Sequence, residues 1–346
     1  MRDMKKLLLF SVAASLLVFT ACKKEFTITV QSNNEAWGSV TGSGTYAKGS
    51  TVSIAAVAKS GYKFVSWQDN NTDNPRSITV NANETYIATF AKESGGGGEE
   101  PTGLDINTGI PVIDALANDM IMVQGGSFLM GSTSGDTYAY DGEKPQHNVT
   151  LSDFYICKYE VTQELWQAVM GSTPTYNGGW TDQYGKGDKY PAYYISWNDC
   201  DTFIQRLNSK TGLNFRMPTE AEWEYAARGG NKSNGYTYSG SNTIGDVAWY
   251  DDNSNNTTHQ VMQKQANELG LYDMSGNVYE WCSDWYSSTY YSESAGASNP
   301  KGPSSGSYRV YRGGSWRSNA RACRVSYRTY RDPDNRNYCL GFRLAL

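Results

Sequence analysis

Histidine is almost absent from this chain, which has only His147 and His259 among its 346 residues. A histidine-rich metal site, or a histidine that activates a nucleophile, needs imidazoles close to their partners, so two isolated histidines argue against both. Charged residues make up only 19% of the chain, and the net charge is −5. A basic nucleic-acid-binding surface is therefore not indicated, and we expect no nucleic-acid partner.

Cysteine pairs of the CxxC type are also missing, which argues against a zinc ribbon. The six cysteines are Cys22, Cys157, Cys200, Cys282, Cys323 and Cys339. Cys282 and Cys323 are a candidate disulfide, because exported proteins meet an oxidising environment. For Cys157 and Cys200, buried free thiols are an equally good interpretation.

The apolar run from Leu7 to Phe19 is too short for a comfortable membrane span. It follows a basic stretch and ends in small residues and Cys22, which is typical of an export signal. Residues 1–22 resemble a bacterial lipoprotein signal, with Phe19 where leucine is usual. The resemblance implies acylation of Cys22 and an exported protein anchored by its acyl chains to a bacterial membrane, the outer membrane, with the periplasmic face and the cell surface both left open. The alternative is an ordinary signal peptide with a chance cysteine.

Tyrosine (26 residues), tryptophan (10) and glycine (35) are abundant, which favours short strands and tight turns over long helices. Residues 23–92 have the alternating pattern of a small all-β module, for example at 26–30 and 51–54. The stretch GYKFVSW at 61–67, followed by Ile78 to Val80, resembles the internalin B-type repeat of bacterial surface proteins, which implies a stalk or adhesive spacer. Residues 93–119, rich in Gly and Glu at their start, are expected to be a linker and lead-in.

Residues 120–346 are expected to form one large domain with three helices. The first runs from Thr162, as N-cap, to Met170, and the second from Trp197 to Thr211. The third begins near Pro218, where Thr219 and Glu222 have the spacing of a capping box.

Six motifs of this domain stand in the order seen in the formylglycine-generating enzyme, or sulfatase-modifying factor, family. They are MVQGGSFLMG, FYICKYEVTQELW, RMPTEAEWEYAARGG, GLYDMSGNVYEWCSDW, RGGSW and the terminal GFRL. The resemblance implies an α+β fold, an elaborated C-type-lectin-like domain of the formylglycine-generating-enzyme type, preceded here by the β module.

The family's oxidase binds copper through two cysteines just after the RGGS turn, and soft thiolates are the ligands that copper(I) prefers. Ser318 stands at the position of the first cysteine, and Cys323 lies next to the arginine motif that follows. We therefore expect no copper and no formylglycine-generating activity. The family's nonheme iron oxygenases need a histidine-rich ligand set, which two scattered histidines do not provide.

A calcium site is a further expectation from the resemblance. Asp273, Gly276, Val278 and Glu280 match a family loop that binds calcium through two side-chain and two backbone oxygens. Asn253 and Asn255 are weaker candidates for a second site. The alternative is a turn in which Asp273 accepts backbone N–H groups.

The C-terminal segment, Arg309 to Leu346, opens on a glycine turn at 312–316 and closes on an apolar run at 340–346. The polar chain between them has almost no aliphatic residue, so we expect irregular chain between two anchored strands, with side chains facing water or a ligand. Arg324, Arg328 and Arg343 are expected to be internal hydrogen-bonding struts.

Residues 317–339 contain no Lys, Glu, Gln, Met or Trp, which are the five amino acids that no codon ending in C encodes. The polar positions there can all be reached from an AAC codon by changing its adenines. That pattern resembles the variable proteins of diversity-generating retroelements. The predicted ligand-binding positions are Arg317, Ser318, Asn319, Tyr327, Thr329, Tyr330, Arg331, Asp332, Asn337, Tyr338 and Cys339.

Three functions remain open from the sequence. The first is a lipid-anchored envelope protein that binds an unknown macromolecular or cell-surface ligand through these positions, since Tyr, Ser, Asn and Arg are adaptable contact residues. The second is a sulfatase-modifying enzyme or activator with altered chemistry, and the third is a structural envelope lipoprotein. A solvated loop with no special role is the alternative for the segment itself.

Overall fold

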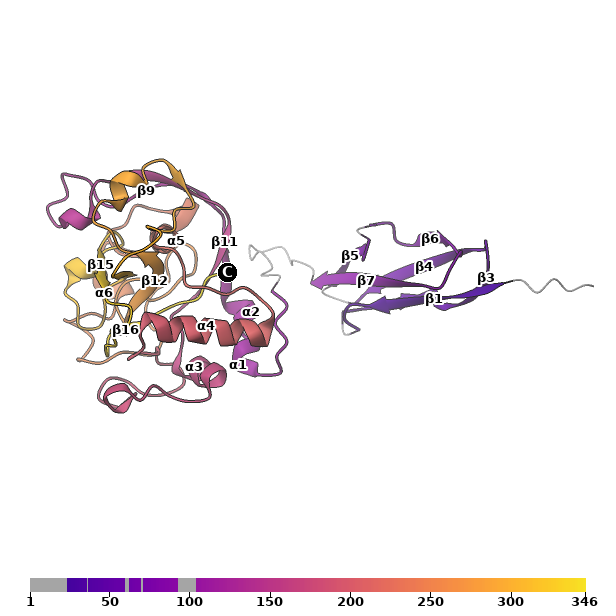
Figure 1. Cartoon of the computed structure of the whole chain (residues 1–346), viewed down its shortest axis with the longest axis horizontal. Helices are drawn as coiled ribbons and strands as arrows, with labels where there is room; N and C mark the ends of the chain where they lie inside the picture. Colours follow the sequence, from indigo (N-terminus) through magenta and orange to yellow (C-terminus); the bar gives the residue numbers. More distant parts are fainter. Residues whose placement is uncertain (1–23, 36, 60–61, 70, 93–103) are drawn as a thin grey trace, which may run out of the picture. The chain divides into compact units, whose positions relative to one another are not determined.

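A computed structural model of the chain describes residues 24–35, 37–59, 62–69, 71–92 and 104–346 (Figure 1). The predicted signal with Cys22 and residues 93–103 of the predicted linker lie outside these described residues. The chain divides into two units, residues 1–101 and 102–346, which we describe separately. Within the described ranges, no helix has the length and apolar character needed to cross a membrane.

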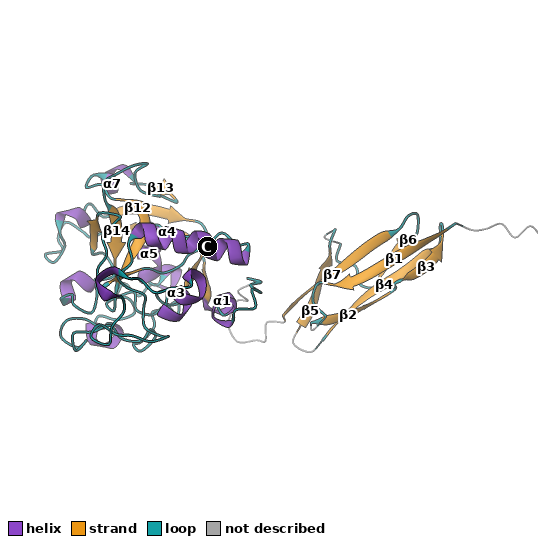
Figure 2. Cartoon of the chain, turned by 60° about the horizontal axis from the view of Figure 1, so that its bottom comes forward, coloured by secondary structure: helices purple, strands orange, loops and turns teal. Residues whose placement is uncertain are grey.

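The first unit is the all-β module that the sequence predicts (Figure 2). Its strands are β1 (Glu25–Ser32), β2 (Gly38–Thr41), β3 (Gly44–Ala47), β4 (Thr51–Ala58), β5 (Tyr62–Trp67), β6 (Arg76–Thr79) and β7 (Glu84–Lys92). They form two sheets, with the orders β3-β1-β7-β5 and β2-β4-β6. Alternate residues of the predicted strands, such as Ile28 on β1 and Ile54 on β4, are buried in one core with Trp67.

The second unit mixes helices and sheets. Its helices are α1 (Pro111–Asp114), α2 (Leu116–Asp119), α3 (Gln163–Met170), α4 (Trp197–Thr211), α5 (Glu220–Ala227), α6 (Ile244–Val247) and α7 (Tyr290–Glu293). Its 3-10 turns are η1 (Asp141–Glu143), η2 (Tyr176–Gly178), η3 (Gly230–Lys232) and η4 (Ala320–Cys323). Its strands are β8 (Met120–Val123), β9 (Gly126–Met130), β10 (His147–Leu151), β11 (Phe154–Cys157), β12 (Tyr279–Trp285), β13 (Ala297–Ser298), β14 (Arg309–Arg312), β15 (Arg328–Arg331) and β16 (Leu340–Gly341).

The three predicted helices are confirmed as α3, α4 and α5. Thr162 caps α3 by accepting the N–H of Leu165. Ser196 caps α4, and Thr219 forms the predicted capping box of α5 with Glu222. These three starts are set by residues next to one another in the chain, so the sequence alone predicts them.

The large unit begins earlier than the predicted Met120. Ile113 of α1 and Leu116 of α2 are buried in the core with residues of α3 and α4. The described part of the lead-in, from residue 104, therefore packs as part of this unit.

The sheet that positions the C-terminal segment has the order β15-β14-β12-β16. β14 and β16 are the two anchored strands that the sequence predicts on either side of the polar chain. The chain between them is not all irregular, because β15 pairs antiparallel with β14, with Arg328 opposite Arg312. The buried Arg328 holds this stretch in the sheet, and its partner is a carboxylate from a distant helix that local sequence does not reveal.

Candidate functional site

The segment starts from a turn that only glycine fits. Gly313 and Gly314 have φ angles of +92° and +75°. A Cβ atom on Gly314 would lie 2.6 Å from Sγ of Cys323 and 2.9 Å from the carbonyl oxygen of Ala322. The turn thus brings the chain after β14 into direct contact with η4.

The three predicted arginine struts are confirmed, and each forms a two-bond ion pair. Arg324 binds Glu143 of η1 at 2.7 and 2.9 Å. Arg328 binds Glu220 of α5 at 2.6 and 2.7 Å. Arg343 is described with Glu280 below. Because the carboxylates come from separate elements, these pairs fix the segment against the rest of the unit.

The predicted ligand-binding positions reach the surface, with one exception. Arg317, Asn319, Tyr330, Arg331 and Asp332 are exposed; Tyr327, Thr329, Asn337, Tyr338 and Cys339 are half-buried; Ser318 is buried.

A series of contacts joins the two ends of this set. The hydroxyl of Ser318 donates to Tyr279 of β12 at 3.1 Å. The ring of Tyr279 packs edge-on against Tyr311 of β14, with centroids 4.8 Å apart. The hydroxyl of Tyr311 accepts from Arg331 at 3.3 Å. One network of side-chain contacts therefore connects the positions before η4 with Arg331, the last residue of β15.

Other contacts of this set are aromatic. Tyr338 accepts a hydrogen bond from Arg317 and stacks on Tyr184, with ring centroids 4.8 Å apart. Tyr327 packs edge-on against Tyr140 at 5.7 Å. We call the connected set of exposed and half-buried positions, together with these contacting tyrosines, the C-terminal surface.

Ser318 is a correction to the predicted set. Its Oγ accepts the N–H of Ser315 at 3.0 Å, so it closes the turn after the two glycines. Its side chain is buried and belongs to the frame of the surface.

Ser318→Leu is accordingly expected to lower the free energy of unfolding by roughly 1–3 kcal/mol, because it leaves a buried N–H without its acceptor and adds volume. Asp332→Ala, at an exposed position of the same segment, is expected to change it by less than about 0.5 kcal/mol. Urea unfolding of both variants measures the difference. Equal changes in the free energy of unfolding for the two variants would show that the side chain of Ser318 is not part of the buried frame.

The cysteines do not pair as predicted. Cys282 and Cys323 are free thiols, so the candidate disulfide is wrong. Cys282 faces the core beneath β12, whereas Cys323 lies against the glycine turn. Cys157 and Cys200 are buried free thiols, which confirms that alternative.

Two thiols nevertheless flank Ser315, which the sequence did not predict. The backbone of Ser315 lowers the pKa of Cys323, and its side chain lowers that of Cys339, but burial outweighs both effects. Burial raises the pKa of Cys323 to about 12 and also raises that of Cys339. For both cysteines, burial therefore disfavours the thiolate form that a soft metal or a nucleophilic reaction needs.

Comparison with known proteins places the large unit in a family. Residues 112–346 match the model of the "Sulfatase-modifying factor enzyme 1-like domain". The chain belongs to this family. Residues 28–94 match the "Divergent InlB B-repeat domain", in agreement with the resemblance of the β module.

Three relatives of this sulfatase-modifying-factor chain illustrate the range of the family. "Chaperone protein LppX" of Paenibacillus barcinonensis is 35% identical over 262 residues, 61% of this chain and 83% of the relative. The "Formylglycine-generating enzyme" of Streptomyces coelicolor is 31% identical over 284 residues, 65% of this chain and 88% of the enzyme. The solved structure of Treponema denticola variable protein 1 is 35% identical, with a TM-score of 0.56, and covers 65% of this chain and 94% of that one. The predicted α+β, C-type-lectin-like fold is confirmed.

The predicted calcium loop of this family member contains a group of buried acids. Both oxygens of Glu280 accept from Arg343 at 2.6 Å, and Oε2 also accepts from Trp223 at 2.7 Å. In Asp273, Oδ2 accepts the N–H of Met262 at 2.8 Å, whereas the buried Oδ1 has no hydrogen-bond partner. The carboxylate of Glu280, which the sequence assigned to calcium, thus accepts hydrogen bonds from Arg343 instead. The Oδ1 atom of Asp273 remains without a hydrogen-bond partner among the described residues.

Glu160, from the loop before α3, joins this group and was missed by the sequence reasoning. Its carboxylate accepts only long hydrogen bonds, 3.4 Å from the N–H of Val278 and 3.5 Å from Asn277. Burial, followed by the charges of Asp273 and Glu280, raises the pKa of Glu160 well above its ordinary value. Burial also raises the pKa of Asp273 to about 6. Three acids thus face one arginine.

The two residues of the predicted second calcium site lie in local turns. The amide of Asn253 closes a local turn, accepting from the N–H of Tyr250 and donating to the carbonyl of Ala248, both at 2.9 Å. Asn255 has a φ of +55°, which marks it as a turn residue. Across the described ranges, no three His, Cys, Asp or Glu side chains form a group suited to a metal ion.

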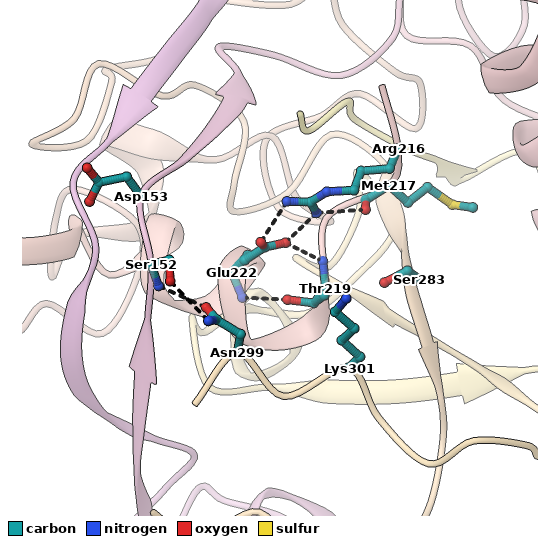
Figure 3. A pocket seen from close by; sticks show the side chains of 9 residues that line it. All are labelled: Ser152, Asp153, Arg216, Met217, Thr219, Glu222, Ser283, Asn299 and Lys301. Carbon is teal, nitrogen blue, oxygen red and sulfur yellow. Dashed lines mark hydrogen bonds and ion pairs between the residues drawn. The ribbon is translucent and has the colours of Figure 1, made fainter. Parts of the chain in front are cut away.

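A cavity of about 470 Å³ lies next to the start of α5 (Figure 3). It is lined by Ser152, Asp153, Arg216, Met217, Thr219, Glu222, Ser283, Asn299 and Lys301. Arg216 and Glu222 pair with each other at 2.6 and 2.8 Å, and Glu222 also accepts the N–H of Thr219. These groups stabilise the start of α5, and no residue of the C-terminal segment lines the cavity.

Proposed function

We propose that this chain is an exported, lipid-anchored envelope protein whose large unit binds a macromolecular ligand through the C-terminal surface. The observation that carries the proposal is that one segment contains both buried, ion-paired residues and surface positions. Residues 323–326 and Arg328, which lie between the predicted ligand-binding positions, are buried, and Arg324 and Arg328 are held by ion pairs, whereas the positions themselves, except Ser318, reach the surface. A rigid frame under exchangeable side chains suits recognition.

Two similarities support the proposal. Treponema denticola variable protein 1 is named for variability, and this chain covers 94% of its structure. The Paenibacillus relative is named a chaperone, a class of proteins that bind other proteins.

The altered-enzyme alternative has less support. It rests on similarity to the formylglycine-generating enzyme. In this chain Ser318, a buried hydroxyl, stands where the resemblance places the first copper-binding cysteine, and burial disfavours the thiolates of Cys323 and Cys339.

The DNA on either side of the gene tests the proposal. We expect a near-identical copy of the 3′ end that differs only at adenines, with a reverse transcriptase gene nearby. Flanks that hold a sulfatase gene and no such copy would remove the main support. The purified domain should then be assayed for oxidation of a sulfatase cysteine peptide.

The lipid anchor is proposed from the sequence alone. Cys22→Ala is expected to move the protein from the membrane fraction to the soluble periplasmic or secreted fraction, because it removes the only acylation site that the signal offers. Detergent-phase partitioning of both forms measures this. A Cys22→Ala protein that stays in the membrane pellet after a salt wash would contradict it.

A structural calcium ion is part of the proposal, with a changed ligand set. The free Oδ1 of Asp273 and the weakly bonded carboxylate of Glu160 suit a hard cation that prefers oxygen. Backbone oxygens of the loop around Gly276 and Val278 would complete the site. Glu280 would not bind the ion itself, because its carboxylate pairs with Arg343 beside the site.

A further inference from the structure

Four arginines of the C-terminal segment form no ion pair with a carboxylate among the described residues. Five other arginines of the segment do pair with a carboxylate, namely Arg312, Arg324, Arg328, Arg336 and Arg343. Of the four that do not, Arg309 is enclosed between Trp197 and Trp285. Of the other three, Arg317 and Arg331 belong to the C-terminal surface, and Arg321 contacts Tyr140 of the same surface. No carboxylate of the described residues pairs with any of these three, so their charge is free for a ligand.

Each of these three guanidinium groups contacts a tyrosine. Arg321 lies 3.6 Å from the ring centroid of Tyr140. Arg317 lies 5.6 Å from that of Tyr338 and donates to its hydroxyl.

Arg331 donates to the hydroxyl of Tyr311. Such contacts hold the planar guanidinium in place and use few of its five N–H groups. The remaining N–H groups can bind a carboxylate in a bidentate manner.

Exposed tyrosines, four of them from outside the segment, lie near these arginines. Tyr138, Tyr140, Tyr176, Tyr308 and Tyr330 are the exposed aromatic residues in the described part of the large unit. Tyr140 packs on Tyr327, and Tyr308 on Tyr330 at 5.2 Å.

Two further contacts bring the remaining tyrosines to this surface. The carbonyl of Tyr138 accepts from Arg321 at 2.6 Å. Tyr176 packs on Tyr194, which packs in turn on Tyr338. All five exposed tyrosines therefore lie at or beside the C-terminal surface.

We propose that the ligand of this surface is a protein that presents an acidic segment. Its carboxylates pair with Arg317, Arg321 and Arg331, and its other side chains pack on the tyrosines around them. Tyrosine and arginine are the residues that contribute most at protein–protein contacts, which favours a protein over a polysaccharide. Asp332 is the acidic member of the predicted set, and it follows Arg331 directly in the chain. The inference rests on the proposed function, because it names the partner of the same surface.

The test uses a random 12-residue peptide library displayed on phage. The bait is the purified chain without its signal, which contains both units. We expect the enriched peptides to carry an excess of Asp and Glu. Arg317→Gln/Arg321→Gln/Arg331→Gln should weaken their binding about tenfold or more, and added salt should weaken binding to the unaltered chain.

Lys210→Gln/Lys232→Gln/Lys301→Gln is the matched control, since it removes the same charge at exposed sites elsewhere. It should bind within about twofold of the unaltered chain. Equal urea midpoints of the three proteins show that the substitutions leave the fold intact.

The other outcomes overturn the inference in distinguishable ways. Enriched peptides without an acidic excess, or peptides that bind the triple arginine variant equally well, overturn the acidic partner and leave the proposed function standing. Binding of heparin, but of no peptide, that is lost in the triple variant makes the ligand a polysaccharide. Enrichment of no peptide and no binding of heparin overturn the inference and the proposed function together.

Discussion

Arg343→Met is expected to lower the free energy of unfolding by about 3–5 kcal/mol, the cost of breaking a buried ion pair by removing one partner. Arg343 and Glu280 are both completely buried and share two hydrogen bonds of 2.6 Å. Arg343 also donates to the carbonyl oxygens of Cys157 and Tyr272. Without the guanidinium, Glu280 stays buried beside Glu160 and Asp273 with no positive charge opposite.

The matched control is Arg336→Met, in the same segment. Arg336 pairs with Asp199 in a similar two-bond geometry, but both side chains are 31% exposed. Its loss is expected to cost at most about 1 kcal/mol. Urea unfolding with a common slope compares the two variants.

A double variant separates the ion pair from the packing. Arg343→Met/Glu280→Leu replaces both charges with apolar groups, and such replacements are often close to neutral. We expect it to be more stable than Arg343→Met alone. Equal losses for Arg343→Met and Arg336→Met would show that burial of the pair does not set its importance.

Local signals in the sequence were sufficient for the helices. The starts of α3, α4 and α5 depend on a capping residue within three positions of its acceptor, so no distant information is needed. The alternation in β1 and β4 predicted the β module for the same reason.

The wrong predictions concern features that depend on contacts with residues far away in the chain. β15 forms because Arg328 is held by Glu220, 108 residues away in the chain. Ser318 is buried because the glycine turn folds back over it. The pairing of Cys282 with Cys323 failed because spacing does not show which face a side chain occupies.

The surface was predicted only in part. The proposed ligand-binding positions were predicted from composition, but Tyr138 and Tyr176, which lie at or beside the same surface, are far from them in sequence. Tyrosine among Gly, Asp and Asn at those two places was the available signal. Under the proposed function, the buried arginine pairs would let this surface vary, because these pairs do not involve the exposed side chains.

Calcium is expected to raise the free energy of unfolding by about 2–3 kcal/mol when its free concentration is near 100 times the dissociation constant. The acids of the loop need a positive charge beyond Arg343. Asp273 has an ordinary pKa near 3.9 when unfolded, and burial raises it to about 6 in the folded chain. Without calcium, this contribution to stability is therefore complete below pH 4 and is lost as the pH rises through about 6.

Asp273→Asn and Asp284→Asn form a matched pair for this test. Both aspartates are buried, and burial raises the pKa of Asp284 to about 7, but Asp284 lies outside the loop and accepts from Ser283 and the N–H of Glu220. Asp273→Asn should abolish the gain in melting temperature that calcium gives over EGTA at pH 7.5. Asp284→Asn should keep it, and in the unaltered chain the gain should shrink as the pH falls through 6.

Glu280→Gln does not discriminate in the same way, because it breaks the pair with Arg343 and destabilises the chain with or without calcium. A calcium gain that survives in Asp273→Asn would place the ion elsewhere. The absence of any gain in the unaltered chain, together with higher stability at pH 5 than at pH 7.5, would mean that protons rather than calcium neutralise Glu160 and Asp273. The loop would then be a structural turn whose stability depends on pH alone.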